Sequence, residues 1–180
     1  MKLEKMRLLN FRCFADIDIH FHRQLTVFVG GNGSGKTAIL DAIALGFGRY
    51  LTKLPGIKGL ASKETDLHIM TKERKAPFFY AKWNATSITN DQPQPVVWQG
   101  MRLRDSAITR KTVFEKLPID LREGLNDRSN NLEDFTDRLI IASLNDSDFY
   151  LPVIAYYGTN RAIREEVKRC LLYTSDAADD

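Results

Sequence analysis

The hydrophobic residues of the chain recur at two spacings. Residues 25–29 form a continuous apolar run, which is typical of a strand buried on both faces of a parallel sheet. From residue 37 to about residue 53 the apolar positions follow a helical period, with members at Ile39, Leu40, Ile43, Ala44, Phe47, Tyr50 and Leu51. The pattern predicts a strand, a short turn and a helix in that order.

Further elements are predicted on either side. Apolar residues alternate with polar ones over 17–21, which indicates a strand with one solvated face. Residues 78–85 and 96–104 predict two strands of a hairpin, and the polar segment 86–95, which holds two prolines, predicts a long connection between them.

The second half of the chain predicts fewer elements. Residues 53–63 are expected to form a loop. Asn131 with the apolar spacing that follows it predicts a capped amphipathic helix. Residues 151–157 predict a buried strand, residues 160–169 a final helix, and residues 126–131 a polar loop.

The turn between the first strand and helix has the spacing G-x-x-x-x-G-K-[ST]. Its glycines let backbone N–H groups converge on phosphate oxygens, and the helix N-terminus adds partial positive charge. Lys36 would bridge the β- and γ-phosphates, and the Thr37 hydroxyl would ligate Mg²⁺. The predicted nucleotide-binding residues are Gly30, Gly31, Asn32, Gly33, Ser34, Gly35, Lys36 and Thr37.

Residues 1–51 resemble the N-terminal lobe of the RecF/SMC-like branch of ABC-type ATPases. The resemblance is carried by the opening segment 8–14, the strands at 17–21 and 25–29, and Asn32 in the loop. It implies an α/β fold of the P-loop NTPase class, with a mixed sheet and a flanking antiparallel β subdomain. It also implies ATP as the nucleotide and places Asn10, Arg12 and Phe14 near it, with Arg12 as a nucleotide-binding residue.

The same resemblance implies a mechanism. Two such heads would associate by sandwiching ATP between them, and their engagement would drive action on DNA. Residues 151–161 resemble a segment found in a bacterial subset of these ATPases, several of which serve in anti-phage defence beside a nuclease. A role in DNA repair, a transporter-type ABC subunit, and a nucleotide-binding fragment without activity stay open as alternatives.

The C-terminal residues 170–180 resemble the translation of a transposase sequencing adapter. Residues 1–169 are then expected to be an incomplete N-terminal lobe of a longer protein. The family's S-G-G or S-G-E signature and its apolar run ending in Asp-Glu do not occur in the sequence. We therefore expect ATP hydrolysis in the full-length parent and no catalytic residue here. Arg161 could approach the phosphates or only start a helix.

Composition limits the remaining possibilities. No apolar stretch could span a bilayer, and the first residues lack the apolar segment of a signal peptide, so we expect a cytoplasmic protein without membrane contact. Cys13 is expected to be a buried small residue, and His20 with His22 lacks a third metal ligand. A basic cluster would suit a nucleic-acid backbone or a solvated face: Arg102, Arg104, Arg110, Lys111 and Lys116.

Overall fold

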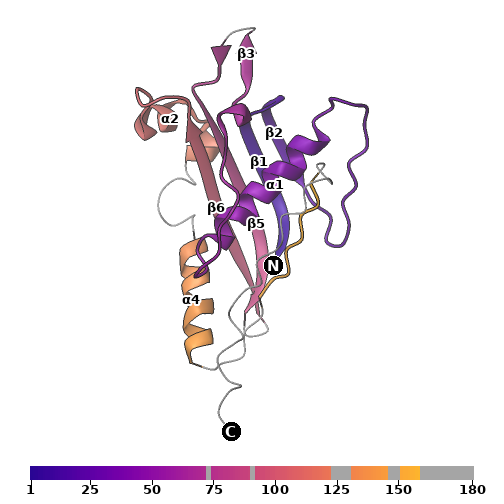
Figure 1. The fold of residues 1–180 in the computed structure, drawn as a ribbon, viewed down its shortest axis with the longest axis vertical. Coiled ribbons are helices and arrows are strands. Elements are labelled where there is room, and N and C mark those ends of the chain that lie inside the picture. Colours follow the sequence, from indigo (N-terminus) through magenta and orange to yellow (C-terminus); the bar gives the residue numbers. More distant parts are fainter. Residues whose placement is uncertain (72–73, 90–91, 123–130, 146–150, 159–180) are drawn as a thin grey trace.

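The computed structural model describes residues 1–71, 74–89, 92–122, 131–145 and 151–158. A four-stranded antiparallel sheet lies at its centre with helices packed against it (Figure 1). In chain order the elements are β1 Lys2–Phe11, β2 Phe14–His20, α1 Lys36–Leu51, the 3-10 helix η1 Glu64–Asp66, β3 Ile69–Thr71, β4 Arg74–Lys75, β5 Phe78–Thr89, β6 Gln92–Leu103, α2 Arg110–Lys116, α3 Ile119–Arg122 and α4 Leu132–Leu144.

The strand order of the central sheet is β2-β1-β5-β6, and β3 and β4 form a separate two-stranded ribbon. Every strand pair formed by the described residues is antiparallel. The register places Trp83 of β5 between Met6 of β1 and Trp98 of β6. The predicted α/β class is confirmed, and these strands form its antiparallel β part.

The two faces of β5 are covered by different helices. Phe79, Ala81 and Trp83 belong to the core beneath α1, while Phe78 and Tyr80 belong to a second cluster with residues of α2 and α3. This division follows from the alternation of side chains along a strand. The sheet is therefore covered on both sides where β5 crosses it.

Two tryptophans fix α1 to the sheet. Trp83 Nε1 donates to the Ala42 carbonyl at 3.1 Å, and Trp98 Nε1 donates to the Gly46 carbonyl at 2.9 Å. Their rings stack with centroids 6.0 Å apart. A Cβ on Gly46 would lie 2.5 Å from Trp83 Nε1, so the helix can approach the rings this closely only with glycine there. The middle of α1 is thereby held in place relative to the sheet.

The predicted helix at 37–53 and the strand at 17–21 are confirmed as α1 and β2. The predicted hairpin is also present, but the long connection over residues 86–95 was wrong because residues 86–89 of β5 pair with residues 92–95 of β6. Pro93 and Pro95 are tolerated because β6 is an edge strand.

The orientation of these prolines can be read from Val97, which lies on the same alternation of β6. Val97 directs its N–H and C=O outward to Asn131, at 2.7 and 3.1 Å. The nitrogens of Pro93 and Pro95 therefore also point away from β5, where no ladder hydrogen bond is needed.

The helix predicted after Asn131 is confirmed as α4, but the side-chain cap was wrong. Asn131 makes no capping hydrogen bond to the helix. Its Oδ1 accepts from the Val97 N–H and its Nδ2 donates to the Pro95 carbonyl, both at 2.7 Å. Asn131 therefore attaches the start of α4 to β6 instead of closing the helix end.

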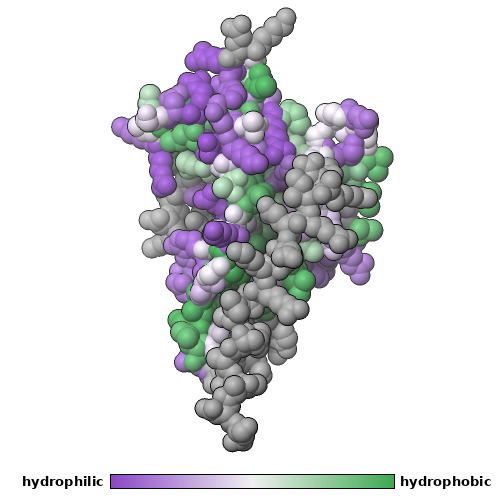
Figure 2. All heavy atoms as spheres, viewed as in Figure 1, coloured by the Kyte–Doolittle hydropathy of each residue, from purple (hydrophilic) through white to green (hydrophobic). Residues whose placement is uncertain are grey.

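The buried strand predicted at 25–29 was wrong. The segment is extended but unpaired, and Val27 and Val29 are 68% and 91% exposed. A strand requires a hydrogen-bonded neighbour, and no described strand runs beside this segment. Only its alternate side chains, Thr26 and Phe28, turn inward. Figure 2 shows hydrophobic atoms along the right-hand edge of the molecule, where the loop between β2 and α1 runs.

The buried strand predicted at 151–157 was wrong for the same reason. Residues 151–158 are described without a strand, and Val153 is 98% exposed while Ile154 packs against the core. The predicted helix at 160–169, Arg161, most of the loop at 126–131 and the tail at 170–180 lie outside the described residues.

Candidate nucleotide-binding site

The loop at residues 30–37 leads directly into α1, whose first residue is Lys36. Gly33 and Gly35 have φ angles of 81° and 91°, a region that L side chains rarely adopt. A Cβ on Gly35 would also lie 2.8 Å from Cys13 Sγ and closer still to the Phe14 ring. Position 35 therefore requires glycine, both for its backbone conformation and for lack of space. A loop that exposes its N–H groups to an anion depends on such residues.

The Lys36 side chain folds back over its own loop. Its Nζ donates to the carbonyls of Gly30 and Gly31, both at 2.7 Å, and to Ser34 Oγ at 3.4 Å. The ammonium therefore lies among the residues expected to surround the phosphates. A phosphate oxygen would compete with these two carbonyls for it.

Thr37 is exposed on the first turn of α1, and its hydroxyl makes no hydrogen bond to the described residues. It is free to ligate a cation beside the loop. Within the described ranges, no group of three or more His, Cys, Asp or Glu side chains could hold a metal ion. Mg²⁺ at Thr37 would thus take its other ligands from phosphate oxygens and water, as this ion commonly does.

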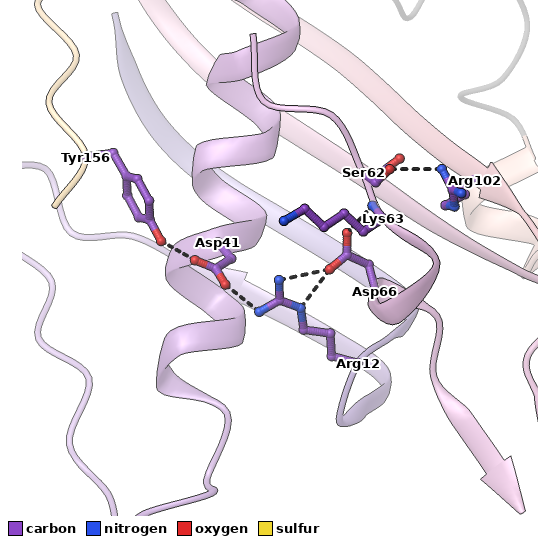
Figure 3. A network of polar contacts seen from close by, with 7 residues as sticks. All are labelled: Arg12, Asp41, Ser62, Lys63, Asp66, Arg102 and Tyr156. Carbon is purple, nitrogen blue, oxygen red and sulfur yellow. Dashed lines mark hydrogen bonds and ion pairs between the residues drawn. The ribbon is translucent and has the colours of Figure 1, made fainter. Parts of the chain in front are cut away.

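Arg12 lies in the turn between β1 and β2, next to the residues that contact Gly35. Its backbone adopts a positive φ of 48°. Its Nε donates to Asp66 Oδ1 at 2.9 Å, and Nη1 donates to Asp41 Oδ2 (Figure 3). Burial disfavours the charge of Arg12, but the hydrogen bonds to Asp41 and Asp66 outweigh it and raise the pKa of Arg12.

Asp66 is the more deeply buried partner, with a side chain 3% exposed against 19% for Asp41. Its second oxygen accepts from the Lys63 backbone N–H at 2.7 Å. The backbone N–H of Arg12 donates to the Asp66 carbonyl at 2.8 Å. Asp66 therefore anchors both the side chain and the turn of Arg12.

Asp41 joins this turn to a distant segment. It lies on α1 four residues after Thr37, so the two share one helix face. Its Oδ1 accepts from the Tyr156 hydroxyl, and this hydrogen bond, aided by burial, raises the pKa of Tyr156 to about 12. Sequence reasoning missed Asp41, Asp66 and Tyr156 as residues of this site.

A cavity of about 270 Å³ opens beside this network. It lies between the β1–β2 turn, α1, the loop before η1 and the 151–158 segment. Its walls carry two cationic groups, two carboxylates and a phenol, together with small and apolar residues. The lining residues are Arg12, Asp41, Leu45, Leu60, Ala61, Lys63, Asp66, Tyr156 and Gly158.

Cys13 is exposed, so its predicted burial was wrong. The turn that presents Arg12 also turns Cys13 out of the sheet, onto the surface of Gly35. The sequence gives no sign of this exposure. Phe11, two residues earlier, is fully buried, and strand alternation would place Cys13 on the same inner face.

The predicted basic cluster divides into two groups. Arg102 donates to the Ser62 carbonyl at 2.9 Å, and Arg104 donates to the Lys75 carbonyl at 3.1 Å, so both connect parts of the fold. The remaining members, Arg110, Lys111 and Lys116, lie on α2, where hydrophilic residues gather in Figure 2. Contact with a nucleic-acid backbone stays a prediction for this surface.

Comparison with known protein families matches residues 5–176 to an AAA domain. The chain is 29% identical over 185 aligned residues to the chromosome partition protein Smc of Lactiplantibacillus plantarum, covering 98% of this chain and 15% of that protein. It is 36% identical over 64 residues to the DNA double-strand break repair Rad50 ATPase of Pyrococcus abyssi, covering 36% of this chain and 7% of that protein.

A further relative is the DNA replication and repair protein RecF of Lactococcus lactis subsp. cremoris, which is 49% identical over 43 residues, covering 24% of this chain and 12% of that protein. The chain thus spans 15% or less of the length of these three relatives. A solved structure described under "Structural biochemistry of ATP-driven dimerization and DNA stimulated activation of SMC ATPases" aligns with a TM-score of 0.38 at 19% identity, covering 71% of this chain and 98% of that chain. None of the described helices is both long and apolar enough to cross a membrane.

Proposed function

Because this chain belongs to the AAA domain family, in its RecF/SMC-like branch, we propose that it binds ATP with Mg²⁺ at the phosphate loop. The loop N–H groups receive the phosphates, Lys36 bridges the β- and γ-phosphates, and Thr37 ligates the cation. The proposed nucleotide-binding residues are Gly30, Gly31, Asn32, Gly33, Ser34, Gly35, Lys36, Thr37 and Arg12.

The observation that carries this proposal is the conformation of the loop. Gly33 and Gly35 adopt positive φ at the start of a 16-residue helix, and Lys36 folds over the same loop. The helix N-terminus, the exposed glycines and the lysine ammonium together suit a polyphosphate. The free Thr37 hydroxyl supplies the ligand that Mg²⁺ requires at such a site.

Arg12 is the second cation of the proposed site. The contacts of Cys13 and Phe14 with Gly35 fix the Arg12 turn against the loop. Its guanidinium already interacts with a carboxylate on the face of α1 that carries Thr37. We propose that it exchanges this carboxylate for a phosphate oxygen when nucleotide binds, since guanidinium pairs strongly with both groups.

For the longer protein we propose ATP hydrolysis coupled to DNA repair or anti-phage defence in the cytoplasm. Two heads would associate around ATP, and a nuclease could be a partner. The names of the Rad50 and RecF relatives concern DNA repair, which supports a partner DNA.

The binding proposal is tested by titrating the chain with a fluorescent ATP analogue in the presence of Mg²⁺. We expect saturable binding. We expect Lys36→Ala to raise the Kd about 10- to 100-fold, because the variant loses the charged hydrogen bonds from Lys36 to the β- and γ-phosphates. Chelation of Mg²⁺ should weaken binding as well.

Lys58→Ala is the matched control. Lys58 is an exposed lysine in the loop after α1, so its removal changes the net charge equally without touching the phosphate loop. Equal affinity of Lys36→Ala and Lys58→Ala, or binding indifferent to Mg²⁺, would reject the proposed site.

A further inference from the structure

Asp41 receives hydrogen bonds from two segments that are distant in sequence. One oxygen accepts from Arg12 in the β1–β2 turn, and the other accepts from Tyr156 in the 151–158 segment (Figure 3). Asp41 itself belongs to α1, the helix that starts at the phosphate loop. A single carboxylate thus connects the arginine beside the loop to an extended segment at the surface.

The two carboxylates that hold Arg12 differ in how easily they can release it. Asp66 is almost fully buried, and its second oxygen is occupied by the Lys63 N–H. Asp41 is more exposed and lies one helical turn from Thr37. A triphosphate with Mg²⁺ at the loop would therefore compete for Arg12 mainly with Asp41, because Asp41 shares a helix face with Thr37 and is the less enclosed anion.

We propose that Asp41 restrains Arg12 until nucleotide binds, and that the hydrogen bond between Asp41 and Tyr156 makes the 151–158 segment sensitive to nucleotide at the phosphate loop. This inference rests on the proposed ATP binding. In the free chain Asp41 shares its charge between Arg12 and Tyr156. When phosphate draws Arg12 away, Asp41 keeps Tyr156 alone, and the phenol then makes an unshared charge-assisted hydrogen bond, which is the stronger kind. Nucleotide thus fastens the 151–158 segment to α1.

Few contacts other than the Tyr156 hydrogen bond attach the 151–158 segment to the rest of the described chain. Ile154 packs against the core, but Val153 and Tyr157 are open to solvent. No backbone hydrogen bond of this segment to another described residue is present. The Tyr156 hydroxyl is its one polar side-chain contact with the rest of the described chain.

Limited proteolysis with chymotrypsin can measure how firmly the 151–158 segment is attached to α1, because this protease cleaves after both tyrosine and phenylalanine. We expect a non-hydrolysable ATP analogue with Mg²⁺ to slow cleavage after residues 156 and 157 several-fold, because an attached segment opens less often to protease. In Tyr156→Phe the site stays cleavable, and we expect nucleotide binding within about 3-fold of the parent but no slowing of cleavage. Cleavage after the exposed Phe114 serves as the internal reference.

Tyr157→Phe is the matched control, since it alters the adjacent exposed phenol and leaves the Asp41 contact intact. It should respond to nucleotide like the parent. Equal slowing in Tyr156→Phe and the parent would overturn the role of Tyr156. Absence of nucleotide binding by the parent would instead reject the proposed function, so the two failures can be distinguished.

A double-mutant cycle tests Asp41. Asp41→Asn should lower the Kd for the nucleotide about 3-fold, because Arg12 is no longer held by a charge, and the gain should vanish in an Arg12→Ala background. An equal gain in both backgrounds would assign the effect to charge alone and overturn the restraint of Arg12 by Asp41. A loss of affinity in Asp41→Asn, with unchanged circular dichroism, would also overturn it.

Discussion

Strand β5 and the segment 151–158 are both rich in apolar residues, but their surroundings differ. β5 lies between β1 and β6, and both of its faces are covered by helices. The segments 25–29 and 151–158 each turn alternate residues inward and leave the others in solvent. A short apolar segment therefore predicts an extended chain with an inner face, while pairing depends on a neighbour that the local pattern does not contain.

The largest effect expected from this comparison is at Trp83. Trp83→Ala should lower the free energy of unfolding by about 3–5 kcal/mol, because it empties a fully buried site and removes the hydrogen bond to Ala42. Val153→Ala, at an exposed position of the unpaired segment, should change it by less than about 0.5 kcal/mol. Urea denaturation followed by circular dichroism measures both. A loss above about 1 kcal/mol in Val153→Ala would show that this surface is covered in solution.

Gly46 tests how closely α1 approaches the sheet. In an open helix, Gly→Ala gains up to about 1 kcal/mol, but here the new Cβ would lie 2.5 Å from Trp83 Nε1. We expect Gly46→Ala to lose about 1–3 kcal/mol in thermal or urea unfolding. Gly31→Ala, whose Cβ would meet nothing within 4 Å, is the control for the added methyl group. A stabilised Gly46→Ala variant would contradict the close packing of α1.

Asn131 tests the edge of the sheet. Asn131→Ala removes two hydrogen bonds of 2.7 Å to β6 and should lower the free energy of unfolding by about 1–2 kcal/mol. Asn131→Asp keeps the acceptor for the Val97 N–H but sets a carboxylate oxygen against the Pro95 carbonyl, so it should also lose stability in the same urea titration. If both variants match the parent, the contact between α4 and β6 contributes no stability.

A smaller effect at neutral pH is expected at Tyr50, whose buried hydroxyl has no hydrogen-bond partner among the described residues. Tyr50→Phe should be neutral or stabilising by up to about 1 kcal/mol, because no bond is lost. Burial raises the pKa of Tyr50 to about 12 from 10.0. The folded state then holds this proton more tightly than the unfolded chain, so its contribution is present below about pH 10 and is lost as the pH rises towards 12.

Urea titrations between pH 8 and 12 measure this contribution. The variant should lose less stability than the parent over that range. Burial also raises the pKa of Tyr80 to about 12. Tyr80 is present in both proteins, so both should keep the part of the loss of stability that it causes. An identical decline in the two proteins would contradict the burial of the Tyr50 phenol.

The phosphate loop and α1 could be predicted because each of their residues acts locally. The glycines at Gly33 and Gly35 set the backbone, and Lys36 and Thr37 follow at fixed positions on the helix. The partners of Arg12 could not be predicted in this way. Asp66 and Asp41 lie 54 and 29 residues from Arg12, and Tyr156 lies 115 residues from Asp41, so only the assembled fold brings them together.

The errors in the strands also have local causes. The prolines of β6 suggested a connection because proline interrupts a central strand, but on an outer edge it interrupts nothing. The apolar run at 25–29 suggested burial on both faces, although the described residues supply a cover for only one. In each case the missing information was the place of the segment in the sheet.

The outer edge of β6 has a consequence for contacts between molecules. Pro93 and Pro95 have no N–H to offer, and the N–H of Val97 is taken by Asn131. A strand from another molecule that approached this edge would find no donor over these alternate positions, so it could not extend the sheet there. Asn131→Ala would return one donor to the edge, and we expect that variant to self-associate in concentrated solution before the parent does.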